Sequence, residues 1–144
     1  MQYFVQYLKS LFFNFLTVFF ANHILSGIDV SNPTKLPHVG GDMIFAFALG
    51  ILNASIFPIL KLTRHHLSAA AIAVVSILLN FTAYALIKFL PAGIEISSIE
   101  GYFFGSLMVS LGSFLTNYVE MKHFQHPHTP SKPEHKHDHK ADQQ

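Results

Sequence analysis

Four long apolar runs, separated by shorter polar segments, dominate the pattern along the chain. They cover residues 4–25, 43–60, 67–89 and 101–119. A membrane-spanning helix needs about 20 mostly apolar residues, because the hydrocarbon layer is roughly 30 Å thick and a helix rises about 1.5 Å per residue. The pattern therefore predicts an all-α integral membrane protein with four transmembrane helices.

Two other interpretations of the runs are less favoured. Core helices of a soluble bundle would show a polar face every 3.6 residues, whereas the runs 43–60 and 101–119 contain no charged residue. A cleaved signal peptide would have a shorter apolar region and a small-x-small cleavage pattern, which ANHILSG at the end of the first run lacks. We therefore expect the first run to be an uncleaved helix.

The composition supports the membrane assignment, since 51% of the 144 residues are hydrophobic and 12% are charged. Mean hydropathy is +0.38. Eight of the 17 charged residues lie in the last 25 positions, so we expect a transmembrane domain over 1–121 and a polar tail over 122–144. The lack of cysteine excludes disulfides and thiolate metal sites, and a formal net charge of +1 gives no support for nucleic-acid binding.

Basic residues near the runs predict the orientation, because Lys and Arg are retained on the cytoplasmic side of a membrane. Lys61 and Arg64 lie between the second and third runs, and four lysines follow the fourth. The segments after the first and third runs hold four acidic residues against Lys35 alone. Both termini are therefore predicted to be cytoplasmic.

The two halves of the chain are similar to each other. At a shift of 66 positions LFFNF at 11–15 aligns with ILLNF at 77–81, and GIDVS at 27–31 aligns with GIEIS at 93–97. After an extra stretch at 32–40 in the first half, the shift falls to about 58–60. This pattern predicts two duplicated helical hairpins that run in the same direction.

Gly27, Pro91 and Gly93 lie in the predicted outer turns of these hairpins. We expect both glycines to occupy tight or left-handed turn positions. Asp42 and Glu100 precede the returning spans, where a carboxylate complements the helix dipole. Apolar and polar residues alternate in GIDVS and GIEIS, which permits a short extended pairing of the two outer loops.

Four asparagines, Asn14, Asn53, Asn80 and Asn117, lie inside the predicted spans. The favoured interpretation is hydrogen bonding between helices of one folded bundle. The alternative is that they line a polar seam or an oligomer interface that can hydrate. Pro58 is predicted to kink the second span near its cytoplasmic end.

Small residues recur at four-residue spacing in the spans, and Gly50 and Gly105 are the glycines among them that we single out. Such residues let helices approach closely, and we favour packing within the monomer over self-association. No Asp, Glu or Arg lies in the middle of a span, which disfavours ion-coupled transport. No phosphate-binding or hydrolase motif is present, so we expect no enzymatic activity.

The tail over 122–144 is polar and proline-rich, and we expect it to be disordered. It contains six histidines, of which His135, His137 and His139 are the candidates for weak, adventitious binding of a divalent metal. Protonation-dependent contact with lipid headgroups and a merely solubilising role remain open alternatives. No other cofactor is expected.

The stretches ILNASIFPILK at 51–61 and ILLNFTAYALIKFLPAGIEI at 77–96, together with the duplicated hairpin, resemble the four-TMS phage holin superfamily IV family of small bacterial membrane proteins. The resemblance covers roughly residues 10–119. The family's second-span Asn and Pro correspond to Asn53 and Pro58, its third-span Asn to Asn80, and its outer Pro and Gly to Pro91 and Gly93.

The resemblance implies a multi-pass protein of the bacterial cytoplasmic membrane, with the lipid bilayer and further copies of itself as partners. Holin activity is assembly into lesions that release a lytic enzyme or collapse the membrane potential. Two alternatives stay open: a small channel or facilitator with a permanent path, and a non-conducting envelope protein that binds lipid or a protein partner.

Overall fold

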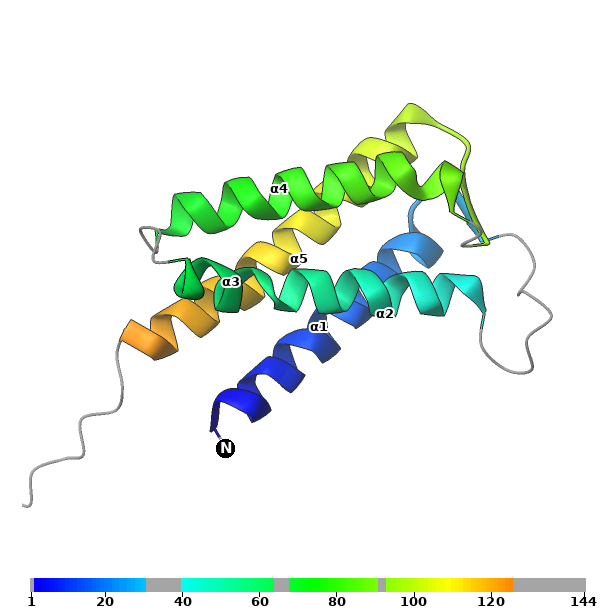
Figure 1. Cartoon of the computed structure of the whole chain (residues 1–144). Coiled ribbons are helices and arrows are strands. Elements are labelled where there is room, and N and C mark those ends of the chain that lie inside the picture. Colours follow the sequence, from blue (N-terminus) through cyan, green and yellow to red (C-terminus); the bar gives the residue numbers. More distant parts are fainter. Residues whose placement is uncertain (1, 31–39, 64–67, 91–92, 126–144) are drawn as a thin grey trace, which may run out of the picture.

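The computed structural model describes residues 2–30, 40–63, 68–90 and 93–125. The elements in these residues follow one another as α1 (Gln2–Ile24), β1 (Ile28–Val30), α2 (Gly41–Ala54), α3 (Ile56–Leu62), α4 (Ala69–Leu86), the 3-10 helix η1 (Ile87–Phe89), β2 (Ile94–Ile96) and α5 (Ile99–Gln125). Because α3 continues α2 after a break at Ser55 and η1 continues α4, the helices form four rods (Figure 1).

The rods pair as two hairpins, since α1 packs along α2 and α4 packs along α5. The hairpins meet mainly where α1 packs against α5. Figure 1 shows the start of α1, the end of α5, the end of α3 and the start of α4 at one end of the molecule, which we call the inner end. The strands lie at the opposite end, which we call the outer end.

Two glycines at the outer end have left-handed backbone conformations. Gly27 and Gly93 have φ angles of +87° and +62°, which lie in the left-handed region that glycine adopts without steric penalty. The strands β1 and β2 pair antiparallel, with Asp29 opposite Glu95 at the centre of the register. The extended pairing that the two similar motifs permit is therefore present, and it joins the two hairpins.

Polar side chains lie where α2, α4 and α5 begin. The Ser68 hydroxyl accepts a hydrogen bond of 3.1 Å from the Ala71 amide at the start of α4. Asp42 and Glu100 lie in the first turns of α2 and α5, as predicted. At both positions a carboxylate stabilises the positive end of the helix dipole.

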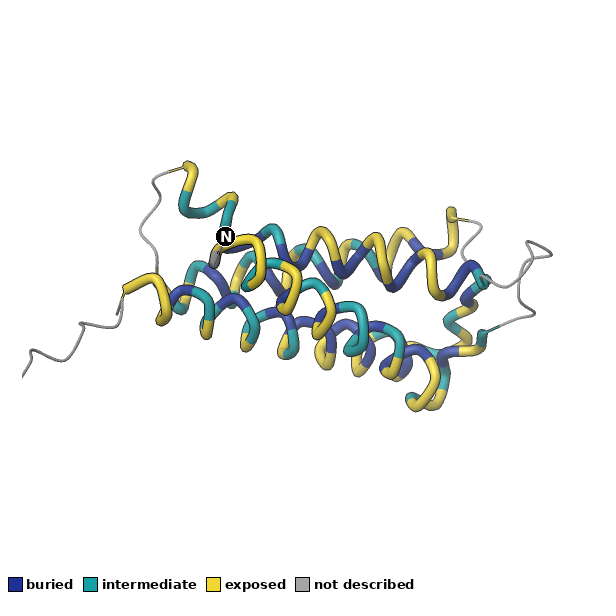
Figure 2. The backbone as a smooth tube through the Cα atoms, turned by 90° about the horizontal axis from the view of Figure 1, so that it is seen from below, coloured by how far each residue is buried: buried dark blue, intermediate teal, exposed yellow. Residues whose placement is uncertain are grey.

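The outward faces of the rods are apolar. Figure 2 shows exposed positions along the outside of each rod and buried positions where rods face one another. The exposed large side chains include Phe12, Phe47, Leu78 and Leu111. Three stretches are long and apolar enough to cross a membrane, namely Tyr3–Ile24, Gly41–Leu62 and Ala69–Phe89.

The fourth rod differs from the predicted span at 101–119 in length and character. α5 is 27 residues long and is not among the three stretches, because its inward face carries serines and an asparagine. It also continues to Gln125, past residue 122, where we expected the disordered tail to begin. Its last turn is held by Phe124, whose ring lies 6.1 Å from that of Phe57 and 3.9 Å from the Lys61 Nζ.

Candidate functional site

Buried polar side chains line the inward faces of the rods and form what we call the polar seam. Each member is at most 6% exposed. On α4 and α5 the members recur three or four residues apart, and on α1 they recur four and eight residues apart, so those on one helix share one face of it. They are Ser10, Asn14, Asn22, Asn53, Ser76, Asn80, Ser106, Ser110, Ser113 and Asn117.

Asn53 of α2 and Asn80 of α4 form a reciprocal amide pair. Each Nδ2 donates to the Oδ1 of the other at 2.9 Å. Asn80 Nδ2 also donates to the Ser76 carbonyl at 2.8 Å. Both side chains are fully buried, so the pair removes two amides from solvent while pairing both acceptors.

Asn117 of α5 inserts its side chain into the second rod. In an unbroken helix the Phe57 amide would donate to the Asn53 carbonyl, four residues earlier. Instead, Asn117 Oδ1 accepts from the Phe57 amide at 2.8 Å, and Asn117 Nδ2 donates to the Asn53 carbonyl at 2.8 Å. An inserted side chain together with Pro58, which has no N–H, accounts for the break at Ser55.

The asparagines of α1 are only partly paired. Asn14 Nδ2 donates to Thr116 Oγ1 at 2.9 Å and to the Ser10 carbonyl at 2.8 Å, while its Oδ1 is buried without a partner. Asn22 Oδ1 accepts from the Tyr84 hydroxyl at 2.8 Å, and its Nδ2 is buried without a partner. The seam therefore contains both satisfied and unsatisfied amide atoms.

Every asparagine of the seam bonds from one hairpin to the other. The pairs are Asn14 with Thr116, Asn22 with Tyr84, Asn53 with Asn80, and Asn117 with the backbone of Asn53 and Phe57. Serine hydroxyls act within the second hairpin, where Ser76 Oγ and Ser113 Oγ lie 3.3 Å apart. Polar contacts thus hold the hairpins together.

Gly50 and Gly105 lie close to neighbouring elements of the chain. A Cβ atom at Gly50 would lie 3.1 Å from the Phe15 amide nitrogen of α1. At Gly105 it would lie 2.8 Å from Ile28 Cδ1 and 3.1 Å from the Tyr84 ring. Both glycines therefore lie where neighbouring elements of this chain approach closely.

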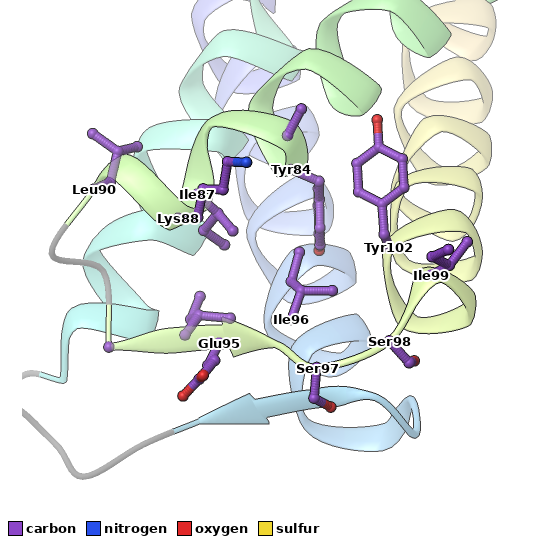
Figure 3. A pocket seen from close by; sticks show the side chains of 13 residues that line it. Tyr84, Ile87, Lys88, Leu90, Glu95, Ile96, Ser97, Ser98, Ile99 and Tyr102 are labelled. Carbon is purple, nitrogen blue, oxygen red and sulfur yellow. The ribbon is translucent and has the colours of Figure 1, made fainter.

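The outer end carries a cavity of about 730 Å³ between the end of α4, η1, β2 and the first turn of α5 (Figure 3). Lys88 and Glu95 are its charged lining residues. Tyr84 also lines this cavity, and its hydroxyl donates a hydrogen bond to Asn22 of the polar seam. The polar seam therefore contacts the wall of the cavity. Nearby, His23 Nε2 lies 3.4 Å from Asp42 Oδ2, which links α1 to α2.

The inner end carries the half-buried Glu120, one residue beyond the predicted fourth span. Its Oε2 is buried without a hydrogen-bond partner. Burial raises the pKa of Glu120 to about 7, against the opposing effect of Lys61. Glu120 lines two hollows, of about 470 Å³ and 390 Å³, on either side of it.

Some predicted site residues lie outside the described residues, namely Pro91 and the tail histidines His135, His137 and His139. Among the residues that the structure describes, no group of three or more His, Asp or Glu side chains could hold a metal ion. The sequence argument missed Thr116, Tyr84 and Glu120. A signal for the hydroxyl groups of the seam is present in the sequence, because a serine precedes an asparagine by four residues at Ser10 and Asn14 and again at Ser113 and Asn117.

The chain matches the profile of a known protein family. The profile of the family described as "Mycobacterial 4 TMS phage holin, superfamily IV" matches residues 5–115, which is more than half of the chain. Neither the curated proteins nor the solved structures include a significant match to the chain.

Proposed function

Since the chain belongs to the mycobacterial 4 TMS phage holin family of superfamily IV, we propose that it permeabilises the bacterial cytoplasmic membrane by assembling into oligomeric lesions as its amount rises. Its partners in this proposal are the lipid bilayer and further copies of the same chain. The proposal assigns it no catalytic reaction and no cofactor.

In the proposed topology the four rods span the membrane with both termini in the cytoplasm. Most of the charges support it: Lys9, Lys61 and Lys122 lie toward the inner end, whereas Asp29 and Glu95 lie at the outer end. Lys88, at the outer end, is the exception. α5 can serve as the fourth span because its polar residues face the seam. Its outward positions are apolar, among them Leu111, Leu115 and Val119.

We further propose that the hairpins are duplicated copies. Ser10, Asn14 and Val18 are buried in α1, and the positions 66 later, Ser76, Asn80 and Tyr84, are buried in α4. At a shift of 60, buried positions 41, 45, 46, 49, 50 and 53 correspond to buried positions 101, 105, 106, 109, 110 and 113. The strand pairing has the same symmetry. Position 28 corresponds to position 94 and position 30 to position 96 at the shift of 66, and the structure pairs 28 with 96 and 30 with 94.

The observation that carries the lesion proposal is that all seam asparagines bond across the two hairpins. Separating the hairpins would expose one polar face on each, while the outward faces stay apolar. Unpaired polar groups are costly in hydrocarbon, so such faces would pair with another copy or line water. Within one chain the partner face has a high effective concentration, so other copies compete only when they are abundant.

The test is a disulfide between the strands, made in a chain that has no cysteine. Asp29 and Glu95 are exposed and are Cα partners in β1 and β2. Cα atoms of directly opposed antiparallel residues lie about 4.5–5.5 Å apart, which suits a disulfide. The double variant Asp29→Cys/Glu95→Cys should therefore tie the two hairpins together at the outer end, and the single variants are its controls.

The chain is expressed in a bacterium from a tightly regulated promoter, and membrane potential and uptake of an impermeant dye are followed. We expect abrupt depolarisation above a threshold amount for the wild type and the single variants. The oxidised double variant should not depolarise the membrane until a reductant is added. Disulfide formation in the cell also supports an outer location of the strands, since the periplasm is oxidising.

Each contrary outcome is distinct. Depolarisation by the oxidised double variant would refute hairpin separation. An intact membrane at high levels of correctly inserted wild type would refute permeabilisation and favour the non-conducting envelope protein. Selective conductance at low levels, without a threshold, would favour the channel or facilitator.

A further inference from the structure

The smaller hollow beside Glu120 is a cleft between α1 and α5 whose polarity changes along its length. Its volume is about 390 Å³, which is within the range of ligand pockets. Gln6, Lys9, Glu120 and His123 line the part nearest the inner end. Thus the cleft has a charged, hydrogen-bonding end at the predicted membrane boundary.

The remaining walls of the cleft are apolar, and they extend toward the middle of the predicted bilayer at Phe13 and Leu115. Phe13, Leu115 and Val119 form these walls and are 57%, 50% and 52% exposed. Ser10 and Thr116 complete the lining, and both belong to the hydrogen-bonded surroundings of Asn14. A ligand that fills the cleft must therefore carry an apolar chain and a polar head in that order.

We propose that this cleft binds an anionic phospholipid, with its phosphate at Lys9 and His123 and one acyl chain along Phe13, Leu115 and Val119. The proposal is independent of lesion formation. A free phosphate would leave the exposed apolar walls unused, whereas a lipid matches both ends. Lys9 is the lysine of the cleft lining, and its ammonium favours an anionic headgroup over a zwitterionic one, which carries a cation of its own.

Glu120 makes this site sensitive to pH. The charged and titratable groups that face it are Lys9 and Tyr3 of α1, Lys61 of α3 and His123 of its own helix. With its pKa raised to about 7, the side chain loses its charge as the pH falls from 8 to 6. The repulsion of a phosphate then disappears, so anionic lipid should bind more tightly at pH 6 than at pH 8.

The experiment titrates the purified full chain in detergent with phosphatidylglycerol and, separately, with phosphatidylcholine of the same acyl chains. Bound lipid is counted by native mass spectrometry. We expect preferential retention of phosphatidylglycerol, reduced about fivefold by Lys9→Gln, because one lysine near a charged surface contributes about 1 kcal/mol. Lys122→Gln is the matched control, since it removes a lysine near the same end that does not line the cleft, and it should change retention less than twofold.

Two further variants test the geometry. Val119→Trp, at an exposed position, should fill the apolar end and abolish the preference for phosphatidylglycerol without loss of helix content. Glu120→Gln should weaken the difference in retention between pH 8 and pH 6.

Three results would overturn the proposal. Equal losses for Lys9→Gln and Lys122→Gln would mean that only bulk charge attracts lipid. Displacement of the lipid by inorganic phosphate would identify a free anion as the ligand. Dimers that exclude lipid and disappear with Val119→Trp would mean that a second copy occupies the cleft.

Discussion

The polar seam has two sides that differ in how completely their amides are paired. On the side of the second rod, Asn53, Asn80 and Asn117 have partners for both Nδ2 and Oδ1. On the side of α1, Asn14 and Asn22 each leave one amide atom buried without a partner. One side is thus a complete network, and the other is incomplete.

The difference arises from the groups that each side meets. Asn53 meets another amide, which can donate and accept, and Asn117 meets a helix break with a free donor and a free acceptor. Asn14 and Asn22 meet single hydroxyl groups, from Thr116 and Tyr84. Pairing an amide completely therefore requires a second amide or open backbone. We expect the complete side to stabilise the fold and the incomplete side to be where water can enter.

The largest effect is expected for Asn117→Leu. The change removes two bonds between helices and leaves the Phe57 amide and the Asn53 carbonyl without their present partners. We expect a loss of about 1–3 kcal/mol in unfolding free energy, since such bonds contribute about 0.6–2 kcal/mol each. Unfolding in mixed detergent, followed by far-UV circular dichroism, measures it.

Leu111→Ala is the control, because Leu111 lies on the same helix and is exposed. It should change the unfolding free energy by less than about 0.5 kcal/mol. An equally stable Asn117→Leu variant would mean that the second rod restores its own hydrogen bond and that Asn117 is not required for the fold.

The Asn53 and Asn80 pair predicts non-additive effects. Asn53→Leu leaves the Asn80 amide buried without its partner and should cost about 1–2 kcal/mol. Asn53→Leu with Asn80→Leu replaces both partners by apolar groups of similar shape and should cost less than either single change. A double-mutant cycle in the same detergent unfolding assay measures the coupling; additive effects would mean that the pair does not interact.

The sequence predicts the rods and turns well because these depend on local pattern. Length and apolarity give the helices, and repeated glycines such as Gly27 give the turns. The pairing of Asn53 with Asn80 depends on the rotation and crossing of two helices, which composition does not encode. The break at Ser55 shows the same limit: Pro58 indicates a kink nearby, but its position depends on Asn117, which is remote in sequence.

On the incomplete side of the polar seam, we expect a substitution to affect stability less than on the complete side and to affect membrane permeabilisation more. Asn14→Leu removes one bond between helices but also removes the unpaired Oδ1. Loss of the hydrogen bond lowers stability, whereas removal of the buried unpaired oxygen raises it, so the unfolding free energy should change by less than about 1 kcal/mol. If water enters the seam at Asn14, dye uptake should require a higher amount of the variant, measured against wild type at matched membrane levels. An unchanged threshold would remove Asn14 from the proposed hydration of the seam.

The last effect on stability concerns Glu120, whose Oε2 is buried without a partner, and it appears only as pH dependence. Its pKa is raised from an ordinary value of 4.5 to about 7 because burial disfavours the carboxylate. Between these values the folded chain binds more protons than the unfolded chain, so stability falls as the pH rises from about 4.5 to 7 and levels off above it. Glu120→Gln should flatten this slope, measured as the melting temperature in detergent between pH 5 and pH 8. The control His123→Gln, on the same helix turn, should retain it, and an equal slope in Glu120→Gln and wild type would show that Glu120 is solvated and ionises normally.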